Sequence, residues 1–166
     1  MAPKKALQDA NSTARFDDFL EGLHLNSQIR VAAKVLLTIV TLMYGVLPAI
    51  ADLNETHLLN PEWSSHARVH GAWFLFFGAA MAFMSLYLVW FRNVLILPVF
   101  VGLMFVAGFW VAFLAAPLYG GALVDENGIE TTILALESNV FTFSVVTTVL
   151  LIVLAYEWLN RDEASV

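Results

Sequence analysis

Apolar residues gather along this chain in four long runs that are separated by polar segments. The runs lie near residues 30–51, 71–91, 94–118 and 140–159. Each is close to the roughly 20 residues that a helix needs to cross about 30 Å of hydrocarbon. The second and third runs contain no charged residue, and Lys34 lies near the start of the first, where its side chain can reach the headgroups. The pattern predicts an all-α integral membrane protein, a bundle of four helices.

The polar segments between the runs set the predicted topology. Little more than Arg92 and Asn93 separates the second run from the third, which predicts a tight antiparallel hairpin, whereas the segments 52–70 and 119–139 are long and polar. An even number of spans places both long loops on one side of the membrane. Of the 8 Lys and Arg residues, only Arg68 lies on that side, so the positive-inside rule predicts cytoplasmic termini and two long outer loops. We interpret the membrane as a bacterial inner membrane, with these loops in the periplasm.

The expected organisation has three parts: a cytoplasmic or interfacial segment over 1–29, the four-helix domain over 30–159, and a cytoplasmic tail over 160–166. In the first part, apolar residues recur at helical spacing with acidic residues between them, which predicts a short amphipathic helix. Its apolar residues are candidates for docking on a partner protein: Phe16, Phe19, Leu20 and Leu23. An ordinary solvated helix explains the same pattern.

Composition changes this picture mainly by exclusion. Hydrophobic residues make up 60% of the 166 residues and charged residues only 13%, which suits a chain whose main partner is the lipid bilayer. The formal net charge of −6 argues against nucleic acid, because phosphates require a basic surface. The absence of cysteine excludes thiolate catalysis and iron–sulfur clusters. With the predicted topology, the excess negative charge lies on the outer side, where it attracts cations or a basic partner domain.

Three of the 4 histidines lie between the first and second spans. If the second helix begins at Ser64 or Ser65, His66 and His70 occupy positions i and i+4 on one face, a spacing that lets two imidazoles bind one ion. A third histidine and two carboxylates at the same predicted depth complete the candidate ligand set: His57, His66, His70, Asp52 and Glu137. Glu137 has a second candidate role, a hydrogen bond to the outer nitrogen of a ligating histidine. Zinc, iron and copper all accept such ligands.

Arg68 is the one cation predicted on the outer side. It is a candidate clamp for an anionic ligand, or an ion-pair partner of Asp52 or Glu137. Aromatic residues nearby could roof a cofactor, although interfacial anchoring and packing are the commoner explanation: Trp63, Trp73, Phe74, Phe76 and Phe77. Three interpretations of the polar cluster stay open, namely a structural polar cap, a metal site, and a site for an organic ligand or proton relay.

The same loop resembles a poorly characterised family of small four-span membrane proteins, loosely DoxX-like. The shared pattern is an Asp, an Asn and a Thr-His pair after the first helix, then Asn-Pro, a Trp, and His-Ala-Arg-x-His entering the second. The matching residues are Asp52, Asn54, Thr56, His57, Asn60, Pro61, Trp63, His66, Ala67, Arg68 and His70. The resemblance implies a four-span fold and a common site for the polar residues, and it implies no particular activity.

Two functions of different classes fit these observations. The first is an outward-facing site that binds a metal or a small ligand for redox or lipid-related chemistry, where a metal could activate water or dioxygen. The alternative is a non-catalytic accessory subunit of a larger membrane complex, which the small size of the chain favours. Transport is disfavoured because the spans contain no buried charge pair and no mid-membrane acid. Whether the protein is an enzyme stays open.

Overall fold

The computed structural model describes residues 21–22, 25–124 and 132–160 of the chain. The part from Leu36 onward forms one compact unit, and the residues up to Val35 form another. The predicted amphipathic helix and its docking residues lie outside the described residues: Phe16, Phe19, Leu20 and Leu23. That helix and the proposed docking role stay predictions.

Four helices in the described part of the chain are long and apolar enough to cross a membrane, which confirms the predicted four-helix fold. They are Leu25–Ala51, α3 (Ser65–Phe91), α4 (Ile96–Tyr119) and α5 (Ser138–Leu159). Three of the four begin earlier than the apolar runs, α3 by six residues. The reason is length: the 27 residues of α3 make about 40 Å of helix, so its polar first turns extend beyond about 30 Å of hydrocarbon.

The first span contains a turn of unusual geometry. A π-helix, η1 (Leu42–Val46), precedes α2 (Leu47–Ala51), and the N–H of Leu47 bonds to the carbonyl oxygen of Leu42 five residues earlier. Pro48 has no N–H, and its ring excludes the carbonyl four residues before it, so a regular α-helical turn cannot be completed here. The wider π turn lets the helix continue through the proline.

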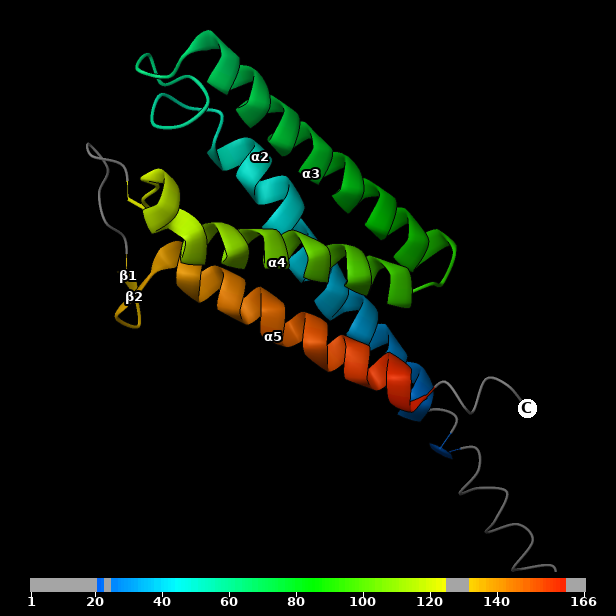
Figure 1. The fold of residues 1–166 in the computed structure, drawn as a ribbon. Helices are drawn as coiled ribbons and strands as arrows, with labels where there is room; N and C mark the ends of the chain where they lie inside the picture. The colour runs from blue at the N-terminus through cyan, green and yellow to red at the C-terminus, as the bar shows by residue number, and fades with distance from the viewer. Residues whose placement is uncertain (1–20, 23–24, 125–131, 161–166) are drawn as a thin grey trace, which may run out of the picture. The chain divides into compact units, whose positions relative to one another are not determined.

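Each helix of the unit from Leu36 onward packs against the next, and the last returns to the first. α3 packs against η1 and α4, while α4 packs against α5, which also contacts η1 (Figure 1). Gly45 of η1 allows a very close approach: a Cβ built on it would lie 2.5 Å from Ala82 Cβ and 3.0 Å from Gly78 O. Small residues on facing helices therefore bring the two backbones together.

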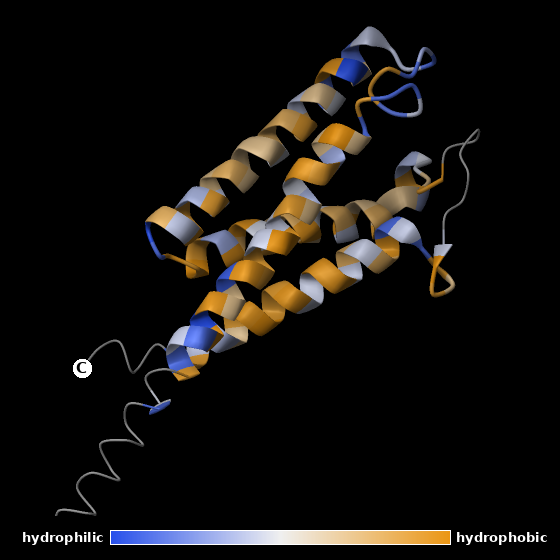
Figure 2. Ribbon diagram, turned by 180° about the vertical axis from the view of Figure 1, so that it is seen from behind, coloured by the Kyte–Doolittle hydropathy of each residue, from blue (hydrophilic) through white to orange (hydrophobic). Residues whose placement is uncertain are grey.

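The two long loops lie at the same end of this unit, and the short α3–α4 connection lies at the other (Figure 1). We call the end that carries the described segments 52–64, 120–124 and 132–137 the two-loop end. Hydrophobic residues dominate the helices, whereas hydrophilic residues gather in the connections, above all between α2 and α3 (Figure 2). The assignment of the two-loop end to the outer side rests on the positive-inside prediction.

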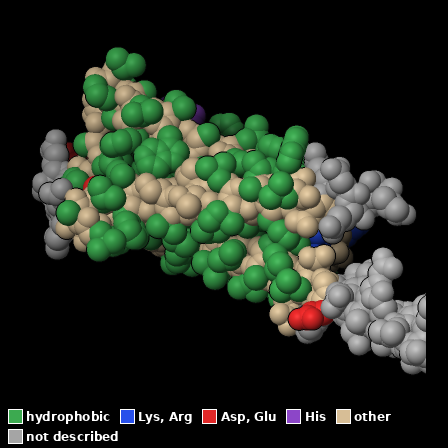
Figure 3. Space-filling view, turned by 90° about the horizontal axis from the view of Figure 1, so that it is seen from below, with side chains coloured by type: hydrophobic (Ala, Val, Ile, Leu, Met, Phe, Trp, Pro, Cys, Tyr) green, Lys and Arg blue, Asp and Glu red, His purple; other side chains and the backbone are tan. Residues whose placement is uncertain are grey.

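Most apolar side chains of the spans face away from the bundle core. Between 17% and 33% of the most apolar window of each span is buried inside the protein. On the face shown in Figure 3, hydrophobic side chains extend along the helices, and charged side chains lie near the ends. This distribution fits a surface that lipid covers, because large contiguous apolar patches are rare on proteins that face water.

The second long loop contains a small hairpin that the sequence pattern did not predict. Strand β1 (Thr132–Ile133) pairs antiparallel with β2 (Leu136–Glu137). The two residues of its turn, Leu134 and Ala135, have φ angles of 51° and 65°. Two-residue hairpin turns with positive φ normally use Asn and Gly, so the sequence of this turn carries no signal for it.

Candidate functional site

The first turns of α3 bring His66 and His70 together as the spacing predicts. Ser64 caps the helix, and its hydroxyl accepts a hydrogen bond from the Ala67 N–H at 3.2 Å. One turn apart on the same face, the two imidazoles meet through their Nε2 atoms at 3.1 Å. Their rings are nearly perpendicular, at 88°, with centroids 4.5 Å apart. Both side chains are exposed, so a ligand can reach the pair from outside.

The hydrogen bond between the two rings determines which ring nitrogens of this histidine pair carry a hydrogen. When both rings are neutral, one Nε2 carries the hydrogen and donates it to the other Nε2. The donor ring then has a bare Nδ1, which accepts hydrogen bonds, and the acceptor ring carries its hydrogen on Nδ1. The neutral pair therefore offers one donor and one acceptor to a ligand, without net charge.

His57 belongs to a second pair, with Asp52, that the α2–α3 loop organises. The Asn54 side-chain oxygen accepts hydrogen bonds from the backbone N–H groups of Thr56 and His57 and from the Thr56 hydroxyl, at 2.9, 3.1 and 2.8 Å. The Thr56 hydroxyl has then used its hydrogen, so its oxygen accepts from His57 Nδ1 at 2.9 Å. The Nε2 atom at the other side of the ring lies 4.0 Å from Asp52 Oδ1.

Asp52 lies at the C-terminal end of α2 in a half-buried position. Burial raises the pKa of its carboxyl above the ordinary value, and the neighbouring His57 opposes part of that rise. A carboxylate at a helix C-terminus also faces the negative end of the helix dipole. The ionised carboxylate of Asp52 therefore lowers the stability of the folded protein. A cationic partner would reduce this loss of stability.

In the described part of the chain, the Arg68 side chain donates hydrogen bonds to carbonyl oxygens of the α2–α3 loop and not to a carboxylate. Its Nε and Nη2 donate hydrogen bonds to the Trp63 carbonyl oxygen at 3.3 and 3.2 Å, and Nη2 also donates to the Pro61 carbonyl at 3.3 Å. The indole of Trp63 lies over Gly71, where an added Cβ would meet it at 3.3 Å. Arg68 and Gly71 together hold the end of the loop against the start of α3.

Glu137 is likewise engaged by its own helix. It is the N-cap of α5, and its carboxylate accepts hydrogen bonds from the backbone N–H groups of Asn139 and Val140 at 2.9 and 3.0 Å. The side chains of Ser138 and Asn139 donate to it as well, at 3.2 and 2.9 Å. An acid at this position satisfies free N–H groups and complements the helix dipole.

The predicted ligand set is therefore divided in the described residues. Asp52 with His57 and His66 with His70 form two pairs, and Glu137 caps a helix. No group of three or more His, Asp or Glu side chains in the described ranges could hold a metal ion. A metal centre with three or four protein ligands stays a prediction without structural support, and the histidine pair is the part of the site that the fold assembles.

A hollow begins at this pair and continues along α3. It has a volume of about 330 Å³ and is lined by His70, Trp73, Phe74 and Phe77. The ring of Trp73 lies 6.2 Å from that of His70, and Phe74 packs against Phe105 of α4 at 5.4 Å. Three of the aromatic residues singled out in the sequence therefore line one hollow with a histidine, and Trp63 and Phe76 lie outside its lining.

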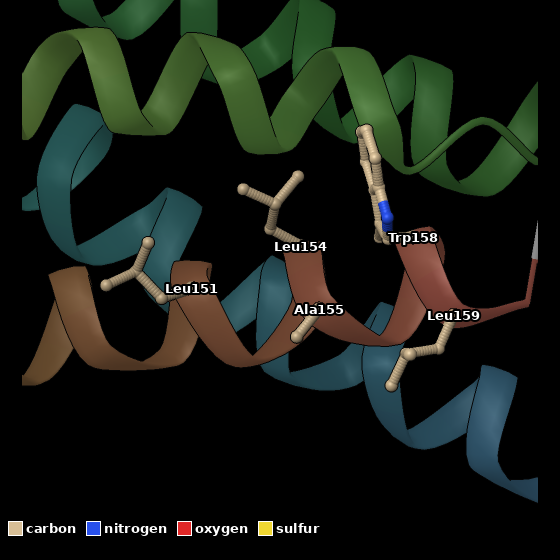
Figure 4. A pocket seen from close by; sticks show the side chains of 5 residues that line it. All are labelled: Leu151, Leu154, Ala155, Trp158 and Leu159. Carbon is tan, nitrogen blue, oxygen red and sulfur yellow. The ribbon is translucent and has the colours of Figure 1, made fainter.

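A second hollow lies at the C-terminal end of α5, away from the two-loop end, and its lining is almost entirely apolar. The residues that line it are Leu151, Leu154, Ala155, Trp158 and Leu159. Figure 4 shows them on the last turns of α5, with Leu154 and Trp158 directed toward the neighbouring helix. The lining contains no acid, base or metal ligand, which leaves the hollow beside His70 as the better candidate.

The bundle interior contains a polar cluster that sequence reasoning missed. Thr41, Tyr44 and Ser85 are fully buried, and the hydroxyls of Thr41 and Ser85 lie close to that of Tyr44 without forming a well-aligned hydrogen bond in the described chain. The Tyr44 ring packs against Phe105 at 5.1 Å, and Gly102 leaves room for its edge. Isolated Thr, Tyr and Ser residues in apolar runs are too common to signal such a cluster, which forms only when η1 and α3 pack.

Comparison with known proteins places the chain in a family. The model of a family of unknown function, DUF6640, matches residues 36–161, well over half of the chain. No curated protein and no solved structure matches the chain. The DoxX-like part of the resemblance gains no support from these comparisons. The chain belongs to DUF6640, a family of unknown function.

Proposed function

We propose that this protein binds a membrane-soluble molecule with a neutral polar head and an apolar body, at the two-loop end of α3. The observation that carries the proposal is the hollow itself, which has a histidine at one end and three aromatic rings along its length. Its volume of about 330 Å³ lies at the lower end of the range for small-molecule sites. With the positive-inside orientation, the site faces the outer side of the membrane.

The depth of the lining residues favours a ligand of mixed polarity. His70 lies in the second turn of α3, in the part of the helix that extends beyond the hydrocarbon. Phe77 lies seven residues further along, or about 10 Å deeper. A molecule that fills the hollow therefore crosses from the headgroup level into the hydrocarbon. Because Trp73, Phe74 and Phe77 are all exposed on the lipid-facing surface, such a molecule can arrive from the bilayer.

The charges around the site favour a neutral head over an anionic one. The described residues of the two-loop end include Asp52, Glu55, Glu62 and Glu137 against the single cation Arg68, whose guanidinium binds carbonyl oxygens. An anion would meet net repulsion here. A hydroxyl head matches both the donor and the acceptor of the neutral histidine pair, and a carbonyl head matches the donor alone.

Photolabelling tests this proposal directly. The probe is hexadecanol with a diazirine in its chain, added to the protein in lipid nanodiscs and followed by peptide mapping. We expect saturable labelling of the α3 peptide that excess hexadecanol suppresses, and a loss of several-fold in Phe77→Ala and His70→Ala. Phe76→Ala is the matched control, because Phe76 is equally exposed on the same helix and does not line the hollow. Labelling spread evenly over all spans, without competition, would refute the proposal.

A further inference from the structure

We infer that His66 and His70 form a two-nitrogen binding site for a divalent transition-metal ion. The inference deepens the proposed function, because the ion would lie at the polar end of the same hollow and could bind the oxygen of the ligand's head. Only the binding of the ligand's oxygen to the ion rests on the proposed function. The metal site itself rests on the geometry of the two imidazoles.

The separation of the two nitrogens is close to what a shared ion requires. Metal–imidazole bonds of about 2.0–2.1 Å at a tetrahedral angle place the two nitrogens about 3.3–3.4 Å apart. The Nε2 atoms of His66 and His70 are 3.1 Å apart, so a shift of a few tenths of an ångström suffices. Both Nε2 atoms lie on the same face of α3, one turn apart, so neither ring has to change its side of the helix, although both must turn until their lone pairs face the ion.

Binding requires one proton to move, and no proton has to leave a neutral pair. The hydrogen shared between the two Nε2 atoms must shift to Nδ1 of the same ring, which is the other neutral tautomer of imidazole. Both Nε2 lone pairs are then available to the ion. Because the rings are exposed, the Nδ1–H groups can be solvated. The cost of preparing the site is therefore small compared with the gain from two metal–nitrogen bonds.

The surroundings favour a cation and leave its remaining coordination positions open. Four carboxylates, from Asp52, Glu55, Glu62 and Glu137, outnumber the one guanidinium among the described residues of this end, which raises the local concentration of cations. None of them joins the histidines to make a three-residue group within the described ranges. An ion held by two imidazoles keeps positions for water or for a ligand oxygen, as catalytic metal sites do.

The choice of ion follows from the ligands. Two imidazole nitrogens suit copper, nickel and zinc, and at a site that imposes no strict geometry the stability order places Cu²⁺ first. We therefore expect Cu²⁺ to bind more tightly than Zn²⁺ or Ni²⁺. Mg²⁺ and Ca²⁺ prefer oxygen ligands and should not compete.

The experiment is a Cu²⁺ titration of the full chain in nanodiscs, purified without a histidine tag, with electron paramagnetic resonance of the bound ion. We expect one Cu²⁺ per chain with hyperfine coupling from two imidazole nitrogens. His66→Gln and His70→Gln should each weaken binding about tenfold or more, and His57→Gln, an exposed histidine outside the pair, should leave it unchanged. Circular dichroism checks that each variant keeps its helix content.

Two results would overturn the inference: equal Cu²⁺ affinity in the double variant His66→Gln/His70→Gln, or an equal loss in His57→Gln. Photolabelling in the presence of a chelator separates this inference from the proposed function. Labelling of the hollow without any Cu²⁺ affinity at the pair would remove the metal site and keep the proposed function. Specific Cu²⁺ binding without saturable labelling would do the reverse.

Discussion

Gly45 offers the sharpest test of how the bundle is packed. A Cβ at this position would lie 2.5 Å from Ala82 Cβ and 3.0 Å from the carbonyl oxygen of Gly78. Favourable carbon–carbon contacts need about 3.5–4.0 Å, so Gly45→Ala must push η1 and α3 apart by about 1 Å. Overpacking of this kind costs about 1–3 kcal/mol of the free energy of unfolding. We expect a lower melting temperature, measured by circular dichroism in detergent micelles.

Gly108 provides the matched control, because a Cβ at this α4 position meets nothing within 4 Å. Gly108→Ala should stabilise the helix by about 0.5–1 kcal/mol, the ordinary gain of Ala over Gly in a helix. Ala82→Gly in the Gly45→Ala background should restore part of the stability, since it removes the closer of the two contacts and leaves the one to Gly78. Equal melting temperatures for Gly45→Ala and Gly108→Ala would show that the close approach of η1 and α3 is wrong.

Three further substitutions and one mass measurement test other parts of the structure. Tyr44→Phe removes a buried hydroxyl that lies close to those of Thr41 and Ser85 without a well-aligned hydrogen bond, so thermal unfolding should show a gain of about 1 kcal/mol, and a loss would show that the three hydroxyls do bond to one another. Glu137→Ala removes the N-cap of α5 and should cost about 1–2 kcal/mol in the same assay. Because the pKa of Asp52 is raised in the folded protein, folding favours the protonated carboxyl. The contribution of Asp52 to the free energy of unfolding therefore falls as pH rises through that pKa. Asp52→Asn should therefore be stabilising at neutral pH, and the gain should vanish as pH falls below about 4, checked by melting curves against pH. Native mass spectrometry of nanodiscs prepared from the source membrane tests the accessory-subunit alternative, which a bare monomer would contradict.

The helices could be predicted from the sequence because the bilayer sets their length and composition. The apolar runs did not mark the helix starts, because hydropathy identifies only the part of a helix that lies in hydrocarbon. Ser64 and Glu137 cap α3 and α5 outside it, and only the Ser64 cap was predicted, from its residue type. The π turn is a local consequence of Pro48, whereas the close packing of Gly45 against α3 is a tertiary effect. The turn of the hairpin uses Leu134 in a conformation that its side chain disfavours, so no local rule identifies it.

The sequence predicted the geometry of the candidate residues where one helix determines it. His66 and His70 need only the Ser64 cap and the helical repeat to meet. The positions of the other candidates depend on how the loop folds. Asn54 accepts a hydrogen bond from the His57 backbone N–H and so helps to fix the loop conformation in which the His57 ring lies beside Asp52. Sequence spacing contains no information about such side-chain hydrogen bonds between near neighbours in an irregular segment.

The way in which the polar residues are used separates structural roles from binding roles. Buried or partly buried backbone groups need partners, and Arg68 and Glu137 supply them to the loop and to the first turn of α5. Substitution of Arg68 or Glu137 should therefore reduce the stability of the folded protein even when no ligand is bound. In the described chain, the imidazoles of His66 and His70 bond through their Nε2 atoms to each other, and no backbone group depends on them there. A substitution of either histidine should leave the melting temperature nearly unchanged while binding is lost, and that separation is what distinguishes a binding site from a polar cap.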